Sequence, residues 1–150
     1  MVNKDTLLAD ILYFIKNDLI NNITDPISSK RSSKSKFVLT SYPNRPVDYP
    51  IITIKAINIE AVRSGMQTTA QDTTITLEIR VWARNEKEKD GLYDDVMDRL
   101  FNIQFTNSGS TENALHDLTT NNPTEIDEEG ESGGQVIKSR LVNIQYKFWN

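Results

Sequence analysis

Residues 73–84 read TTITLEIRVWAR, and this stretch, with the segment that follows it, decides the fold. Its apolar residues take every second position from Ile75 to Val81, and polar or charged residues lie between them. Successive side chains of a strand point to opposite faces. The alternation therefore predicts a half-buried strand with one apolar and one polar face.

The period of the apolar residues changes after Arg84. Two series at four-residue steps follow, Leu92, Val96, Leu100 and Tyr93, Met97, Phe101. This spacing predicts a helix over residues 86–104, and Asn85 with Glu88 resembles a capping box at its start. Because a sheet face and a helix stripe bury each other, we predict an α+β fold. It has a mainly antiparallel sheet of four or five strands with two helices packed on one face.

The other helix is expected at residues 5–23, where leucines and isoleucines form one wide stripe ended by Asp25-Pro26. Residues 27–36, ISSKRSSKSK, are polar and repetitive, which predicts a mobile loop. This loop is either a plain linker or an arm that becomes ordered on meeting a partner or a phosphate-rich surface.

Three further strands are expected in the sheet. A short strand is predicted at residues 37–40, and a longer one at 51–59, with Ile57 and Ile59 on the face of Ile51. Residues 60–72 connect to the next strand, and they form an extended hairpin arm if the strands continue into them. Residues 114–118 form either a short strand or a helical turn, and the polar, acidic residues 121–134 form a loop or hairpin tip. The last strand spans 135–149, and the apolar parity changes near Leu141, as a β-bulge or a bend would cause.

Length and composition limit the class of protein. A chain of 150 residues is expected to form one domain, residues 1–150. It has no cysteine, no apolar run of about 18 residues and no signal-peptide pattern, so we expect a soluble intracellular protein without a membrane partner. A net charge of −4 disfavours a general nucleic-acid binder.

The charge is distributed unevenly along the chain. A basic stretch at residues 30–36 contrasts with an acidic one at 125–131, and the two are either solvated loops or complementary surfaces of neighbouring subunits. Two tryptophans, one on the polar face of the central strand and one near the C-terminus, also suggest an interface. The candidate subunit or tube interface residues are Lys30, Arg31, Lys34, Lys36, Trp82, Glu125, Asp127, Glu128, Glu129 and Trp149.

Patterns that would carry catalysis or metal binding are incomplete. His116 is the single histidine, and no Gly-x-Ser-x-Gly elbow accompanies it. A zinc site needs three or four ligands that this composition does not offer, and residues 127–131 lack the alternation of a calcium loop. We therefore expect no catalytic residue, cofactor or metal, and a protein that is not an enzyme.

The order of elements resembles the tail terminator (tail completion) proteins of long-tailed bacteriophages and phage-tail-like particles. The resemblance is carried by YPIITI at residues 49–54, IRVWA at 79–83, YDDVMDRL at 93–100 and a terminal strand that ends in aromatic residues. It implies a structural virion protein that forms a ring, commonly a hexamer, on the last ring of the tail tube. Such a ring stops tube polymerisation and provides the surface that joins the head.

The resemblance also implies partners and a location. The partners are the chain itself, the tail tube protein and the head–tail connector protein, and DNA is only a passing cargo. The location is the head-proximal end of the virion tail, after assembly in the host cytoplasm. Three alternatives remain: a head-completion or neck connector protein, a small intracellular ligand-binding domain, and nucleic-acid binding through residues 30–36, which lack aromatic stacking residues.

Overall fold

The computed structural model describes residues 7–44, 47–63, 65–66, 71–106, 115–129 and 136–149, without the side chains of residues 7, 71, 104–106, 116, 127–129, 136 and 149. Its elements are α1 (Leu7–Asn22), the 3₁₀ turn η2 (Lys34–Lys36), β1 (Val38–Leu39), β2 (Ile51–Arg63), β3 (Gln71–Ala83), α2 (Glu86–Thr106), β4 (Leu115–Thr120), β5 (Thr124–Glu129) and β6 (Val136–Trp149). They form the α+β fold that the sequence predicts.

The strands form one sheet in the order β1-β2-β3-β6-β4, and β5 pairs with β6 further along the same edge as β4. All pairs are antiparallel except β1 with β2. The sheet has six strands rather than the four or five predicted. The main difference lies within residues 121–134, predicted as a loop or hairpin tip, where residues 124–129 pair with β6 along their whole length.

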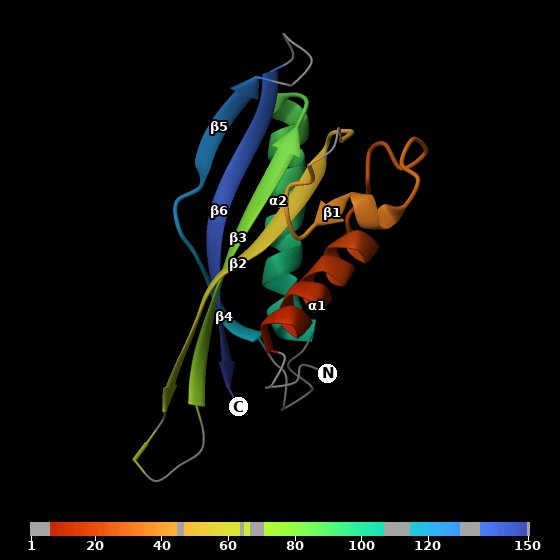
Figure 1. The fold of residues 1–150 in the computed structure, drawn as a ribbon. Coiled ribbons are helices and arrows are strands. Elements are labelled where there is room, and N and C mark those ends of the chain that lie inside the picture. Colours follow the sequence, from red (N-terminus) through yellow and green to blue (C-terminus); the bar gives the residue numbers. More distant parts are fainter. Residues whose placement is uncertain are drawn as a thin grey trace.

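Both helices pack on one face of this sheet, as predicted (Figure 1). The central strand contributes the inward residues of its alternating pattern, and α1 and α2 contribute one stripe each. The fully buried residues include Ile11, Ile15, Leu19, Ile75, Leu77, Val96, Leu100 and Ile144. The hydroxyl of Tyr146 on β6 donates to the carbonyl of Leu100 at 2.6 Å, which joins the sheet to α2 inside the core.

The register of β2 corrects the predicted face assignment. A register shift between Ala56 and Asn58 places Ile59 opposite Ile75, so Ile59 packs against the core instead of sharing the face of Ile51. Ile57 lies at the irregularity and is 48% exposed. An extra residue in one strand reverses the parity beyond it, and a pattern of isoleucines on both faces hides this change.

The predicted β-bulge near Leu141 is wrong. β6 pairs with β3 in unbroken register from Lys138 to Trp149. The parity appeared to change because the inward-facing residues of β6 change from charged to apolar along the strand, while the alternation of its two faces continues. Val142 meets the apolar core, whereas Arg140, two residues earlier, meets the acidic beginning of α2.

Helix α2 departs from prediction in two details. Asn85 Oδ1 accepts from the backbone nitrogen of Glu88 at 2.9 Å, but the carboxylate of Glu88 accepts from the backbone nitrogen of Arg84 and not of Asn85. The cap is therefore half of a capping box. Phe101 is 51% exposed, because the buried stripe continues from Leu100 to Ile103 instead.

Candidate assembly surfaces

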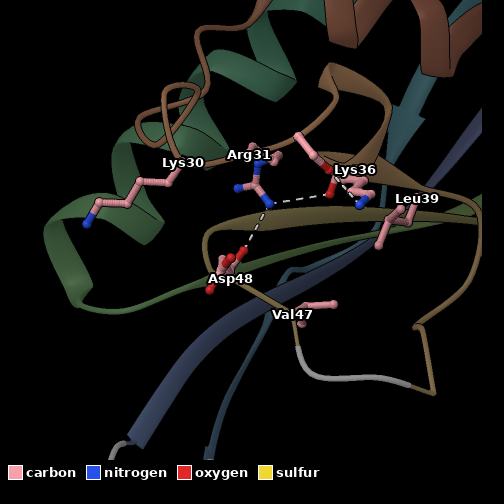
Figure 2. Close-up of a pocket in the computed structure, with 7 residues that line it drawn as sticks. Lys30, Arg31, Lys36, Leu39, Val47 and Asp48 are labelled. Atoms are coloured by element: carbon pink, nitrogen blue, oxygen red, sulfur yellow. Dashed lines mark hydrogen bonds between the residues drawn. The ribbon is translucent and has the colours of Figure 1, made fainter.

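The loop between α1 and β1 is folded around Arg31. Its guanidinium donates from Nε to Oδ2 of Asp25 at 2.6 Å and from Nη2 to the carbonyl of Pro50 at 2.6 Å. A further bond from Nη1 reaches the carbonyl of Asp48 at 3.0 Å (Figure 2). The ion pair is almost closed to solvent, with side chains 5% and 9% exposed. The prediction of a mobile loop is therefore wrong, because the Arg31 guanidinium joins Asp25 at the start of the loop to the carbonyls of Asp48 and Pro50 just before β2.

The lysines of the same loop have a different environment. Lys30, Lys34 and Lys36 are exposed, and Nζ of Lys36 donates to the hydroxyl of Ser32 at 2.6 Å. Lys30 and Lys36 lie on a pocket of about 210 Å³ that also contains Asp48 (Figure 2). We call residues 30–36 the basic loop. It presents three ammonium groups on a backbone that Arg31 fixes.

Trp82 lies on the outer face of the sheet, but the chain covers it. Only 6% of its surface is exposed. Its indole Nε1 donates to Oγ1 of Thr53 at 3.1 Å, the Arg80 guanidinium lies 3.7 Å from its ring centroid, and the Tyr42 ring packs at 4.9 Å. The proline-rich segment before β2 thus supplies the cover that was expected from a second subunit.

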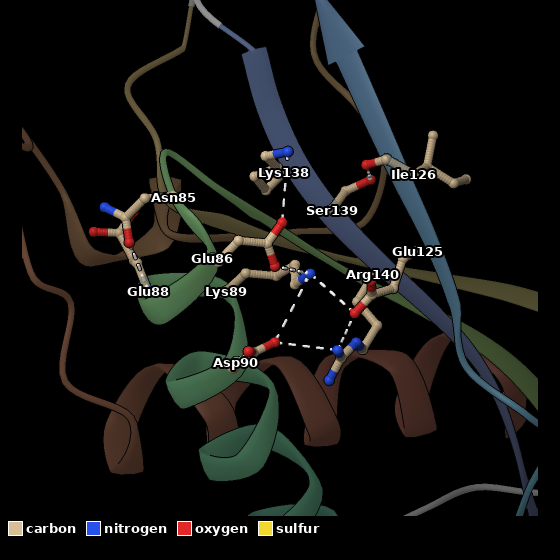
Figure 3. Close-up of polar contacts among 10 residues, drawn as sticks. All are labelled: Asn85, Glu86, Glu88, Lys89, Asp90, Glu125, Ile126, Lys138, Ser139 and Arg140. Atoms are coloured by element: carbon tan, nitrogen blue, oxygen red, sulfur yellow. Dashed lines mark hydrogen bonds and ion pairs between the residues drawn. The ribbon is translucent and has the colours of Figure 1, made fainter.

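An ionic cluster joins the beginning of α2 to β5 and β6 (Figure 3). Lys89 is 1% exposed, and its Nζ lies 2.6 Å from Glu86, 3.0 Å from Glu125 and 3.8 Å from Asp90. Arg140 pairs with Glu125 and with Asp90, and its guanidinium also faces the ring of Tyr93 at 4.9 Å. Lys138 completes the cluster with a contact to Glu86 at 3.5 Å.

This cluster contains the group of carboxylates that resembles a metal site. One oxygen each of Glu86, Asp90 and Glu125 lie within 4.8 Å of one another. Arg140 and then Lys89 lower the pKa of Glu125 to about 2, because both donate to its carboxylate. Protein cations therefore already occupy the place that a metal ion would take, and we assign no metal to it.

The β2–β3 hairpin extends past the helices as an arm (Figure 1), and β6 pairs with β3 along it as far as Asp72. Its strands remain paired to Arg63 and Gln71, as the sequence allowed. Three apolar side chains are exposed on it: Ile57 at 48%, Val62 at 58% and Met66 at 98%. Among the described strands, β1 pairs with β2 only at Ile52 and Thr53, so the outer edge of β2 is open beyond that point.

The structure therefore separates the residues predicted for an interface. Arg31 and Trp82 are buried within the chain, and Glu125 is exposed but bound to Lys89 and Arg140. The three lysines of the basic loop remain on the surface. Asp127, Glu128, Glu129 and Trp149 have paired backbones, but their side chains lie outside the described residues, as does that of His116.

Sequence reasoning missed Lys89 and Arg140. Both stand in charged segments that look like ordinary solvated faces, and only the crossing of α2 under β6 brings them together. One signal was present: Arg140 shares strand parity with the inward residues Val142 and Ile144. A charge at an inward position requires a buried or half-buried partner.

No protein family matches the sequence, and no curated protein matches it. Among solved structures, the chain is similar to one from the virion of a native gene transfer agent particle. The TM-score is 0.41 and the identity 9%, over 88% of this chain and 92% of that chain. A similarity of this size establishes neither a shared fold nor a shared function. Neither described helix is both long and apolar enough to cross a membrane.

Proposed function

We propose that this chain is a structural protein of a phage-like particle, which self-associates into a ring and caps the end of a tail tube. The ring would stop tube growth and bind the head–tail connector, and DNA would pass through it. The proposal is supported by the resemblance of residues 49–54 and 79–83 to tail terminator proteins. It is carried by one structural observation, the β2–β3 arm.

The arm has the properties of an unsatisfied assembly element. Val62 and Met66 expose apolar surface far from the helices, and the adjacent edge of β2 offers unpaired backbone groups. Open edges and exposed apolar side chains are a liability in a monomer, because they promote association with other chains. A neighbouring subunit or the tube would bury both.

The role we propose is not enzymatic. The most concentrated group of ionisable side chains, around Lys89, is an ion-pair network in which the acidic and basic groups balance. Such a network positions α2 against the sheet, and Arg140 and then Lys89 hold the pKa of Glu125 well below its usual range, so this carboxylate does not stay protonated as a general acid must.

The test is the mass of the protein in solution, measured by light scattering over a concentration series with and without cognate tail tubes. The arm variant Val62→Asp/Met66→Asp is compared with Tyr13→Asp, which alters an exposed aromatic residue on α1. We expect wild type and Tyr13→Asp to form rings or to bind tubes. The arm variant should stay monomeric with an unchanged melting temperature.

A wild-type protein that remains monomeric at every concentration and ignores the tubes would contradict the proposal. Capture by DNA-filled heads in place of tubes would assign the chain to the neck. Ligand-induced stabilisation of a strict monomer would favour a ligand-binding domain.

A further inference from the structure

One hydrogen-bonded row crosses the whole sheet. Val38 of β1 pairs with Ile52, Ile52 with Val81, Val81 with Arg140, and Arg140 with Glu125 of β5. β1 and β5 therefore lie at the same level along the strand direction, at opposite edges of one sheet (Figure 1). The basic loop leads directly into β1, so it shares this level.

The edge formed by β1 is basic. Lys30, Lys34 and Lys36 make no ion pair with any carboxylate that the structure describes. The positive charge of Arg31 is already neutralised by Asp25, so the lysines supply the surplus. The Arg31 bonds hold this loop in place before any partner arrives, which lowers the entropic cost of binding.

The edge formed by β5 is acidic. Its sequence TEIDEE has four acidic residues in six positions. Glu125 is bound by Lys89 and Arg140, and the sequence of the strand adds three more acidic residues, Asp127, Glu128 and Glu129. β5 has β6 as its one partner among the described strands, so its other edge is also open.

We propose that the basic loop of one copy binds β5 of the next copy, so that subunits associate head to tail. This inference rests on the proposed function and names the surfaces that would form the ring. Within one chain the two edges cannot meet, because β2, β3 and β6 lie between them. If two basic loops met, or two β5 strands, charges of the same sign would face each other. A head-to-tail contact instead places the basic loop of one copy against the acidic β5 of the next.

The common level of the two edges also favours a closed ring. A head-to-tail contact repeats the same rotation and shift from each subunit to the next. Because the two surfaces lie on one row of the sheet, they can meet without a shift along the strands. With the rotation axis along the strands, such a contact has no rise, and it closes into a ring when its repeated rotation completes a full turn.

The test uses two full-length variants with reversed charge. Lys30→Glu/Lys34→Glu/Lys36→Glu makes both edges acidic, and Asp127→Lys/Glu128→Lys/Glu129→Lys makes both basic. Self-association is measured by sedimentation velocity at low salt. Each variant alone should associate at least about tenfold more weakly than wild type, since like charges face each other across the contact. An equimolar mixture should recover assembly, with the two variants alternating.

Two controls keep the result specific. Lys55→Glu/Lys87→Glu reverses exposed lysines outside the basic loop and should associate within about twofold of wild type. A single chain that carries all six reversals should assemble alone, because its two edges are again complementary. Melting temperatures within about 3 °C of wild type establish that the variants are folded. If a reversal variant melts earlier, the corresponding glutamine variants replace it.

The outcomes separate this inference from the proposed function. If wild type assembles and both reversal variants assemble equally well, the interface is wrong although the chain is still an assembly protein. The same conclusion follows if the variants lose assembly but the mixture does not regain it. If the basic loop serves another anionic ligand, its reversal will leave assembly unchanged and abolish binding of a short DNA duplex. If the wild-type protein stays monomeric under all conditions, both proposals are wrong.

Discussion

Nζ of Lys89 lies 3.0 Å from Oε1 of Glu125, although the two residues are 36 positions apart in the sequence. The lysine side chain is 1% exposed and the glutamate 54% exposed. The cation is thus held inside the protein, while its anionic partners stay in contact with water. This asymmetry determines how substitutions at the junction of α2, β5 and β6 will behave.

Lys89→Met should change the free energy of unfolding by less than about 1 kcal/mol, because replacing a buried ion by an apolar side chain of similar length is often neutral. Lys89→Ala should cost about 1–3 kcal/mol, since it also removes the packing of the aliphatic chain. Urea unfolding of both variants measures the difference. Equal losses for methionine and alanine would show that the charge, and not the packing, supplies the stability.

Glu125→Gln should make the free energy of unfolding depend less steeply on pH in the acidic range. The pKa of Glu125 is lowered from 4.5 to about 2, first by Arg140 and then by Lys89. A carboxylate with a lowered pKa stabilises the fold above its unfolded pKa and loses this effect as pH falls through the folded value. The stability gap between wild type and Glu125→Gln should therefore shrink from pH 4.5 to about pH 2. Thr124→Gln, at the neighbouring exposed position, serves as the control and should keep the wild-type slope.

Arg31→Ala should destabilise the protein by about 3–5 kcal/mol, because it leaves the Asp25 carboxylate buried without its cation. Arg31→Lys should restore only part of this loss, since an ammonium cannot reproduce the forked bonds to Asp25 and Pro50. Lys30→Ala, on the exposed side of the same loop, should stay within about 0.5 kcal/mol of wild type. Thermal and urea denaturation distinguish these cases, and a neutral Arg31→Ala would restore the interpretation of a mobile loop.

Trp82→Ala should act on folding and not selectively on assembly. Removing a buried aromatic side chain costs about 3–5 kcal/mol. Trp82→Phe should cost less, because it keeps most of the ring contact with Tyr42 and Arg80 and loses the bond to Thr53. Chemical unfolding of monomer at low concentration measures this directly. Normal monomer stability with lost assembly would return Trp82 to the subunit interface.

The sequence was most informative where the burial pattern is regular. The alternation from Ile75 to Val81 predicted β3 and its inward face, and the step from Leu92 to Leu100 predicted the buried stripe of α2. It was least informative where polar residues pair across the chain. β5 resembles a loop in sequence because it is acidic, and it is a strand because the adjacent edge of β6 was available for hydrogen bonding.

For the assembly surfaces too, the sequence predicted some features and only the structure revealed others. Composition alone located a basic and an acidic stretch, because charge is a local property that needs no fold to be seen. The sequence does not reveal that Arg31 forms an ion pair with Asp25, that the ring of Tyr42 covers Trp82, or that Glu125 forms an ion pair with Lys89. These contacts join segments that are distant in the chain or meet in tight turns. Only the tertiary structure decides them, because the register of the sheet sets which residues become neighbours.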